Sequence, residues 1–315
     1  MTGLLVRRLA SMVPLLFVVS IVVFLLVHIV PGDPARTLAG GEFATPERVQ
    51  LVRHQLGLDQ PIMAQYGHWL GNALHLDFGK SLTTNRSVLT ELAERLPVTA
   101  GLVAGAVLFA VLVALPAGIA AAVRQRRWLD KVIIAGVSLG MSVPTFWLAL
   151  ILVSVFAVQL KLLPAIGFVH FTDSPVEWAR HLLLPWISIS VVMAASLTRQ
   201  LRASLCDALE DDYIRTARSK GLAPAKVVGK HALKNAAMPA ITVLGLQIGY
   251  LFGGAVIVEQ IFSIPGVGSL LIQAVINKDV PVLQGGVIVL ALLVLAINFA
   301  VDVVYGYVNP KVRVA

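Results

Sequence analysis

Long apolar runs separated by short polar stretches dominate the chain. Each of these runs is long enough to cross a hydrocarbon core of about 30 Å as a helix. Because a backbone in lipid must satisfy its own hydrogen bonds, and no run shows the two-residue alternation of a barrel strand, every run is expected to be helical. The predicted fold class is an all-α polytopic membrane protein with six transmembrane helices, at residues 9–30, 98–123, 132–158, 182–200, 240–260 and 284–308.

The positions of lysine and arginine predict which side of the membrane each end faces. If both termini and the loops at 124–131 and 199–234 lie inside, the inner side carries 16 of these residues and the outer side nine. Membrane proteins keep the excess of basic residues in their cytoplasmic loops. Both termini are therefore expected in the cytosol. The first apolar run is expected to be retained, because it ends in Val30-Pro31-Gly32 without a small-x-small cleavage site.

Composition and motifs exclude several classes of protein. A mean hydropathy of +0.84 with 13% charged residues is too apolar for a soluble protein of this size. The pI of about 9.9 would suit a nucleic-acid binder, but the basic residues flank apolar runs without an accompanying aromatic surface. Gly79-Lys80-Ser81 lacks the earlier glycine of a phosphate loop, since Leu74 stands there. The single cysteine, Cys206, has no partner for an internal disulfide. We therefore expect that the chain is not an enzyme and that it has no catalytic residue, metal or cofactor of its own.

A polar segment between the first two predicted spans, residues 31–97, is expected to form an external subdomain. Pro46-Glu47 is typical of a helix start and Gly57 of its end, and a second helix is expected from Gln65. The three histidines of this segment, His54, His68 and His75, fit no local metal-ligand spacing. The predicted domains are residues 1–30, 31–97, 98–308 with a cytosolic loop at 201–239, and a tail at 309–315.

A basic stretch from Asp212 to Pro239 interrupts the apolar pattern. Its first part predicts a helix that ends at Gly221, because acidic residues lie at its start, basic residues at its end, and glycine accommodates a left-handed cap. Pro224 suits the first position of a second short helix, and Pro239 opens the next apolar run. Three interpretations fit: an ordinary basic loop, a site for anionic lipid heads, or a docking element for a soluble partner.

The order of residues in this stretch carries a resemblance to a known family. Tyr213 to Gly221, followed after nine residues by His231-Ala232-Leu233, resembles the signature loop of ABC-importer permeases. It is most similar to the dipeptide/oligopeptide (and nickel) permease family and its B-type subunit. Further motifs extend the resemblance over nearly the whole chain: Pro31-Gly32-Asp33-Pro34, Leu56-Gly57-Leu58-Asp59, Asp77-Phe78-Gly79-Lys80-Ser81, Arg95-Leu96-Pro97, and Pro265-Gly266-Val267-Gly268, which is expected to be a re-entrant or interfacial element.

The resemblance implies a permease subunit in a prokaryotic inner membrane that imports dipeptides and short peptides. The implied partners are an external solute-binding protein, a second homologous permease subunit, and two cytosolic ATPase subunits that bind the ATP and Mg. The residues implied to contact an ATPase subunit are Tyr213, Ile214, Arg215, Thr216, Ala217, Arg218, Ser219, Lys220, Gly221, Leu222 and His231. Tyr213, Ile214, Ala217 and Leu222 are expected to fill a cleft of that subunit, and the basic residues to make polar contacts.

Other cargoes and other classes of protein stay open on the sequence. Nickel, glutathione or another small solute would suit the same architecture, because specificity in such systems resides largely in the external binding protein. A proton-coupled carrier that works alone would need buried acidic relays and an internal repeat, and Asp302 is the one candidate relay. A membrane scaffold without transport is the third alternative.

A few residues within or beside the predicted spans suggest further roles. Asp33 and Glu259 lie at outer ends of spans, where two carboxylates would attract the amino group of a peptide, or would cap helices and tie the external subdomain down. Asp302 is expected to pair with a basic loop residue near the cytosol. Glycines four apart predict close helix packing, and three prolines within spans predict kinks. These residues are Gly101/Gly105, Gly136/Gly140, Gly245/Gly249/Gly253, Pro116, Pro144 and Pro185.

Overall fold

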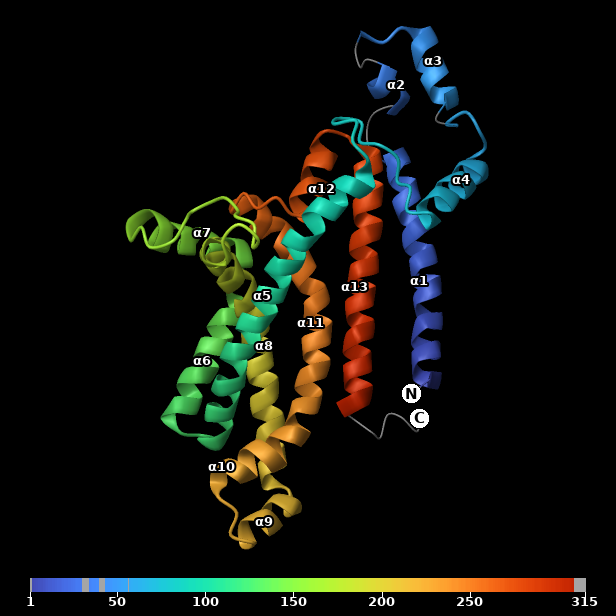
Figure 1. Ribbon diagram of the computed structural model, residues 1–315. Helices are drawn as coiled ribbons and strands as arrows, with labels where there is room; N and C mark the ends of the chain where they lie inside the picture. The colour runs from blue at the N-terminus through green and yellow to red at the C-terminus, as the bar shows by residue number, and fades with distance from the viewer. Residues whose placement is uncertain (1, 30–33, 40–42, 56, 309–315) are drawn as a thin grey trace. The chain divides into compact units, whose positions relative to one another are not determined.

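A computed structural model describes residues 2–29, 34–39, 43–55 and 57–308 (Figure 1). These residues form helices joined by turns and loops. In those ranges the only strand-like pairing is one bridge, between Lys80 and Ser87. The predicted all-α class is confirmed. The helices are α1 (Thr2–Ile29), α2 (Pro34–Ala39), α3 (Pro46–Gln55), α4 (Ile62–Leu74), α5 (Val88–Val123), α6 (Trp128–Ser142), α7 (Thr145–Leu152) with the π-helix η2 (Val153–Gln159), α8 (Pro175–Glu210), α9 (Asp212–Ser219), α10 (Pro224–Lys226), the π-helix η3 (Val227–Ala232), α11 (Leu233–Ile261), α12 (Val267–Ile276) and α13 (Val280–Val308).

The chain folds as two compact units. The first unit comprises Met1–Leu5, Ala100–Ile264 and Ala296–Ala315. The second unit comprises Val6–Thr99 and Pro265–Leu295. The basic stretch after Asp212 therefore belongs to the first unit, and the predicted external segment to the second.

Four helical elements are long and apolar enough to cross a membrane, within the ranges that the structure describes. They are Val88–Val123, Pro175–Glu210, Pro224–Ile261 and Val280–Val301. A fifth is possible if the bent pair of α6 and α7 counts as one span, and α1 contains a shorter apolar stretch at Ala10–Leu25. The predicted count of six spans stays a prediction.

The predicted span at 132–158 is broken into two helices. α6 ends at Ser142, and the helical segment Thr145–Gln159 leaves at an angle of 103°. Pro144 stands at the break as the residue before α7, with extended backbone angles. Proline cannot donate a backbone hydrogen bond and disfavours helical angles in the residue before it, so the helix ends there. The sequence predicted a kink at Pro144, and the structure makes it a near right-angled turn.

Two other helices run well past the apolar segments that predicted them. α5 begins at Val88 and continues through Pro97, which the sequence analysis placed in the approach to the span. α8 covers Pro175–Glu210 and is capped by the preceding residue, Ser174, whose hydroxyl accepts a hydrogen bond from the backbone N–H of Glu177 at 3.3 Å. Hydrophobicity marks the part of a helix that suits lipid, whereas capping residues mark where the helix ends. The polar extensions were therefore missed.

Close helix packing at glycine is confirmed for several of the predicted positions in the first unit. A Cβ atom on Gly105 would lie 2.0 Å from the ring of Trp186, and one on Gly101 would lie 3.3 Å from that of Trp178, so both α5 glycines admit α8 tryptophans. The Trp186 indole also donates a hydrogen bond to the carbonyl of Gly101 at 3.3 Å. Further contacts of this kind join Gly140 to Val191 and Gly245 to Val301, whereas a Cβ on Gly136 or Gly253 would meet nothing within 4 Å.

A buried carboxylate organises the core of the second unit. Asp279 is 2% exposed and precedes α13. Its Oδ2 accepts hydrogen bonds from the hydroxyls of Ser81 at 2.5 Å and Thr83 at 2.6 Å. The turn after Phe78 is thereby fixed to the α12–α13 junction, beside the apolar core residues Phe78, Val88, Leu92, Val267, Leu270 and Val282. The Phe78-Gly79-Lys80-Ser81 motif thus has a structural role in this unit.

The helices of the predicted external segment form close to where the sequence placed them. α3 starts at Pro46, and Gly57 follows it with a φ of +66°, as expected of a residue that ends a helix. α4 begins at Ile62, ahead of the predicted Gln65. His54 Nδ1 lies 2.6 Å from Asp59 Oδ2, and this hydrogen bond raises the pKa of His54 and lowers that of Asp59. No group of three potential metal ligands occurs among the described residues.

Candidate functional site

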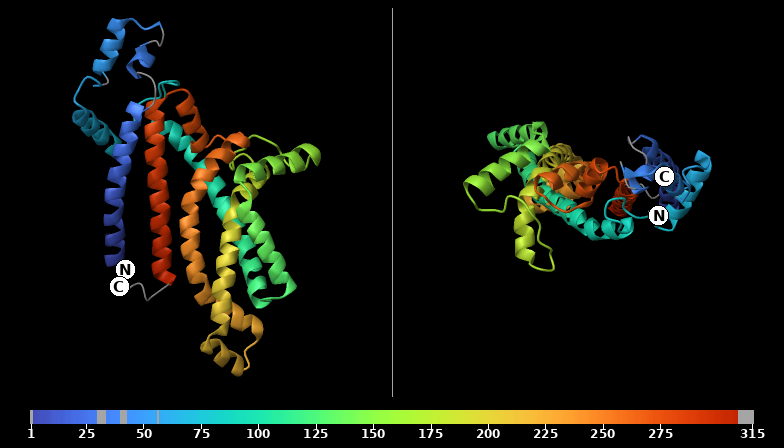
Figure 2. Two further views of the ribbon diagram at one scale, coloured as in Figure 1. Left: turned by 180° about the vertical axis from the view of Figure 1, so that it is seen from behind. Right: turned by 90° about the horizontal axis from the view of Figure 1, so that it is seen from above.

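The short helix α9 sits where two long helices meet. Figure 1 shows α9 and α10 together at one end of α8 and α11, and Figure 2 shows α8 (yellow) and α11 (orange) running alongside each other. A single residue, Asp211, separates the end of α8 from α9. On the other side, a turn of four residues leads to Pro224, the first residue of the helical segment Pro224–Ile261. Movement of α9 would therefore reach both long helices through short connections.

Gly221 takes the left-handed conformation that its position predicted. Its φ is +73°, and its N–H donates to the carbonyl of Arg218 at 2.9 Å. The next N–H, of Leu222, donates to the carbonyl of Ala217 at 3.4 Å and so closes the end of α9. A Cβ on Gly221 would meet nothing within 4 Å, so glycine is favoured here by backbone conformation and not by space.

The inner face of α9 is anchored within this chain. Ile214 is fully buried and Ala217 is 7% exposed. Both belong to an apolar cluster contributed by the ends of α5, α8 and α11 and by η3: Ala122, Leu205, Cys206, Ala208, Ile214, Ala217, Val227, Ala232 and Ala236, with Leu222 packed against it. The expectation that Ile214 and Ala217 fill a cleft of a partner does not fit this placement, because helical periodicity directs these two side chains toward the chain's own core.

The outer face of α9 and its C-terminal turn is polar and exposed. Tyr213 is 38% exposed, and the remaining members of the predicted set on this face are also exposed: Arg215, Thr216, Arg218, Ser219, Lys220 and Gly221. Arg215 makes one exposed ion pair, to Asp212 at 3.3 Å. Such a pair contributes little to stability. The outer face therefore offers basic and hydroxyl groups that the fold itself does not require.

The predicted second short helix is the beginning of a much longer one. From Pro224 the chain passes through the π-helical turn Val227–Ala232 into α11, and Pro239 lies inside that helix and does not open it. A π-helical turn takes one residue more per hydrogen-bonded ring than an α-helix, and such turns occur often at functional sites. His231 lies in this turn and is partly buried. The structure thus brings His231 next to the cluster under α9.

An ion pair that the sequence analysis missed fastens α6 to α8 near the same end. Arg202 donates from Nε to Asp130 Oδ1 at 2.5 Å and from Nη2 to Oδ2 at 2.7 Å. The backbone N–H of Arg126 donates to Asp130 Oδ2 at 2.8 Å. The Asp130 side chain is only 4% exposed, and Arg202 lies one helical turn before Cys206 of the apolar cluster. The pair links positions 72 residues apart, so no local sequence signal identifies it.

A small cavity adjoins the outer face of α9. It has a volume of about 180 Å³ and is lined mainly by apolar side chains, including Leu209, Leu222 and Val228, with Arg218 at its edge. An apolar hollow beside a basic surface suits a side chain of a docked partner. Two residues of the predicted ATPase-contacting set, Arg218 and Leu222, are among the described residues that line this cavity.

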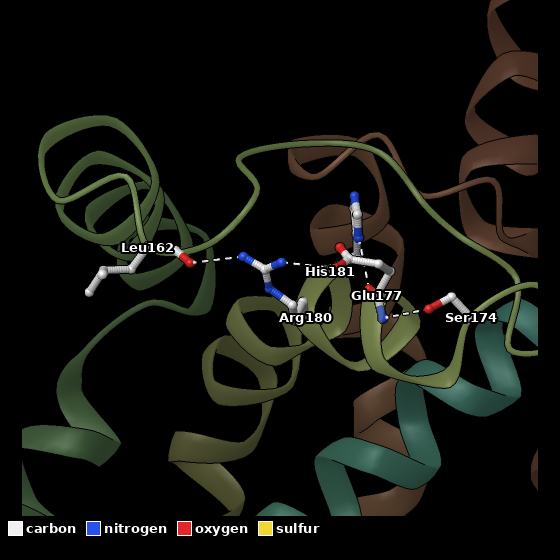
Figure 3. A network of polar contacts seen from close by, with 5 residues as sticks. All are labelled: Leu162, Ser174, Glu177, Arg180 and His181. Atoms are coloured by element: carbon white, nitrogen blue, oxygen red, sulfur yellow. Dashed lines mark hydrogen bonds and ion pairs between the residues drawn. The ribbon is translucent and has the colours of Figure 1, made fainter.

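Polar contacts fix the opposite end of the first unit. Arg180 donates to Glu177 at 2.8 Å and to the carbonyl of Leu162 at 3.5 Å, which holds the loop before α8 against its first turns (Figure 3). His181 contacts the Glu177 carbonyl at 2.8 Å. Gly167 donates to the carbonyl of Phe262, just past the end of α11, at 2.9 Å. Hydrogen bonds therefore hold the loop between η2 and α8 against the start of α8 and the end of α11.

Of the predicted acidic side chains, the structure describes that of Glu259. Glu259 lies in the last turn of α11 and is fully buried. Asp33 lies outside the described residues, and for Asp302 only the helical backbone of α13 is described. A role of Asp33 and Glu259 along a substrate path stays a prediction.

Comparisons with known proteins find similar sequences over nearly the whole chain. The family model described as "Binding-protein-dependent transport system inner membrane component" matches residues 114–314, and a model of the N-terminal part of such membrane components matches residues 1–103. A protein of Brucella abortus (strain 2308), provisionally named a peptide transport system permease, is 42% identical over 313 residues, 99% of each chain. The glutathione transport system permease protein GsiC of Escherichia coli (strain K12) is similar to the same degree and extent.

A solved structure shares the fold. A chain of the MetNI methionine ABC transporter in an inward-facing conformation superimposes with a TM-score of 0.58 at 19% identity. The match covers 69% of this chain and 96% of that one.

Proposed function

We propose, from the premise that this chain belongs to the family of binding-protein-dependent transport system inner membrane components, that α9 is the element through which ATP hydrolysis drives the import of short peptides. As a member of that family, the chain is a multi-pass inner-membrane permease subunit of an ABC importer. A transporter of this class joins permease subunits to ATPase subunits. Those ATPase subunits bind the ATP and Mg, and the helices of this chain line the transport pathway and move during the transport cycle.

The geometry of α9 is the single observation that carries the proposal. Its inner face is fixed to the chain by Ile214 and Ala217, whereas its outer face presents the exposed side chains of Arg215, Thr216 and Arg218, the first two of which contact Asp212 of the same helix. A surface helix that is anchored on one side and polar on the other is suited to dock in a partner. In this arrangement Tyr213, Ser219, Lys220, Gly221 and Leu222 border the docked surface, and His231 supports it from the π-helical turn.

The proposed mechanism is a lever. Closure of the two ATPase subunits on ATP moves α9 bodily, and the single-residue link at Asp211 passes this movement to α8. At 1.5 Å per residue, the 36 residues of α8 extend over about 54 Å, so a tilt at one end displaces the other. The tied loop between Leu162 and Arg180 would follow that displacement. Packed helices that slide or tilt against each other are a common means of switching access.

The lever requires a definite orientation in the membrane. The α9 end of the first unit would face the cytosol, in keeping with the basic residues of the 199–234 loop, and both termini would lie on the same side. The complete importer would contain a second homologous permease subunit, two ATPase subunits and an external solute-binding protein.

Cross-linking tests the docking of α9. The chain has one cysteine, Cys206, which is buried, so a cysteine introduced at exposed Thr216 can be addressed selectively. We expect Thr216→Cys to cross-link to an ATPase subunit in the assembled complex with a short bifunctional reagent, and the yield to change when ATP is added. Arg127→Cys, exposed in the turn before α6, is the matched control and should give little product. Equal yields at the two positions would contradict the proposal.

Uptake tests the cargo. Relatives named for peptide and for glutathione transport favour a short peptide. We expect a strain with the binding protein and ATPase subunits to accumulate labelled dipeptide only when this chain is present. Competition by unlabelled glutathione or nickel separates the alternative cargoes. Accumulation that persists without the ATPase subunits and follows the proton gradient would instead favour a carrier that works alone.

A further inference from the structure

The second unit contains a cavity that the proposed transport role does not use. It has a volume of about 280 Å³ and lies between α1, α4, the turn after Asp77 and the first turn of α13. Its floor consists of buried side chains, Phe24, Phe78, Val280 and Gln284, each at most 8% exposed. The volume suits a molecule of the size of one or two amino-acid residues, below the usual range for larger ligands.

The amide of Gln284 leaves an unused acceptor in this cavity. Gln284 is 6% exposed, and its Nε2 donates to the α1 carbonyls of Val23 at 3.2 Å and Phe24 at 3.3 Å. These two bonds identify the nitrogen, so the remaining atom is the carbonyl oxygen Oε1. That oxygen accepts no hydrogen bond from a described residue. Every fully buried side-chain nitrogen or oxygen of the described residues has a hydrogen-bond partner, so an oxygen without one is not fully buried. Gln284 Oε1 must therefore be open to the cavity.

The rest of the lining favours a cation. The aromatic residues Phe24 and Trp69, whose ring centroids lie 5.9 Å apart, line the cavity together with Phe78. Asp77 contributes a carboxylate: one oxygen accepts from the Gly79 N–H at 2.9 Å, and the other makes no hydrogen bond to a described residue. Among the described residues that line the cavity there is no lysine or arginine, and His68 is the one other ionisable group. Aromatic faces together with a carboxylate and a free carbonyl oxygen attract an ammonium ion.

We propose that this cavity binds a primary ammonium group carried on a short apolar chain. The ammonium donates to Gln284 Oε1 and to Asp77, and the chain packs on the aromatic walls. An ammonium has three N–H donors and no acceptor, which suits the open acceptor oxygens of Gln284 and Asp77. The same chemistry occurs in free amines and peptide amino termini and in the ethanolamine head group of a phospholipid. The inference depends on the second unit alone and does not require α9 to dock an ATPase.

Binding of a model amine tests the proposal. The full-length chain in phosphatidylglycerol nanodiscs would be titrated with n-butylammonium chloride, and in parallel with the neutral isostere n-butanol, by saturation-transfer NMR. We expect the ammonium to bind and the alcohol to bind much more weakly. Asp77→Asn keeps the acceptor for Gly79 but removes the charge, and should weaken ammonium binding roughly tenfold or more. Glu47→Gln, an exposed carboxylate outside the cavity, is the matched control.

The result also identifies the source of the ammonium. Native mass spectrometry of the complex from ethanolamine-containing membranes would find a retained phospholipid in wild type and Glu47→Gln, and not in Asp77→Asn, if the ligand is a lipid. Retention of no lipid together with butylammonium binding assigns the site to a free amine. The proposal fails if wild type binds no butylammonium, if butanol binds equally well, or if Asp77→Asn binds as wild type does.

Discussion

Replacing Gly221 with valine is expected to reduce import about tenfold while the complex still assembles. The left-handed φ of +73° costs a residue with a Cβ about 1–2 kcal/mol, and a β-branched residue is the least suited to it. A penalty of that size changes the population of the native turn by a factor of roughly 5–30. The turn joins α9 to the helix at Pro224, so its loss would let the ATPase subunits hydrolyse ATP without moving that helix.

The measurement is transport and ATP hydrolysis in the same proteoliposomes. Gly221→Asn is the matched control, because asparagine adopts left-handed angles more readily than other residues and nothing within 4 Å would obstruct its side chain. We expect Gly221→Asn to retain most of the import. A Gly221→Val complex that assembles normally and imports at the wild-type rate would refute the lever.

Replacing Arg202 with methionine is expected to lower the thermal stability of the chain by several degrees. The Asp130 carboxylate would remain 4% exposed with only the Arg126 N–H as partner. Removing one member of a buried ion pair costs about 3–5 kcal/mol, because the other charge is left uncompensated. The lower end of that range applies here, since the Arg202 side chain is 26% exposed.

Thermal unfolding of the purified chain in detergent measures this effect. Arg199→Met provides the comparison: Arg199 lies on the same helix but is exposed, so its loss should change the midpoint little. The double variant Asp130→Asn with Arg202→Met should recover part of the loss, because it leaves no buried charge. Equal midpoints for Arg202→Met and Arg199→Met would show that the ion pair does not fasten α6 to α8.

Local signals predicted the features that local chemistry determines. The left-handed turn at Gly221, just past the end of α9, follows from a glycine after basic residues. The start of the next helix at Pro224 follows from the preference of proline for a first helical position. The break at Pro144 had a local cause too, although the sequence does not contain its angle. The membrane class follows from hydropathy alone, because runs of this length have no other stable solution in lipid.

Features that depend on distant partners were missed. In the sequence, Ile214 and Ala217 are apolar residues of a helix predicted to be exposed. Their burial within the chain becomes evident only from their packing with Leu205 and Val227. The Asp130–Arg202 pair and the hydrogen bond from Ser81 to Asp279 join positions far apart in sequence. The open oxygen of Gln284 is visible only once its nitrogen has been assigned to two carbonyls of α1.

The two attachments of α9 differ in stiffness. Only Asp211 separates α9 from α8, so a displacement of α9 would be passed to α8 almost in full. Toward α11 the chain passes a glycine turn and then the π-helical turn Val227–Ala232, whose wider winding can give up or take in part of a turn. Under the proposed docking of α9, the link to α8 would therefore be the stiffer of the two connections, and a push on α9 would displace α8 more than α11.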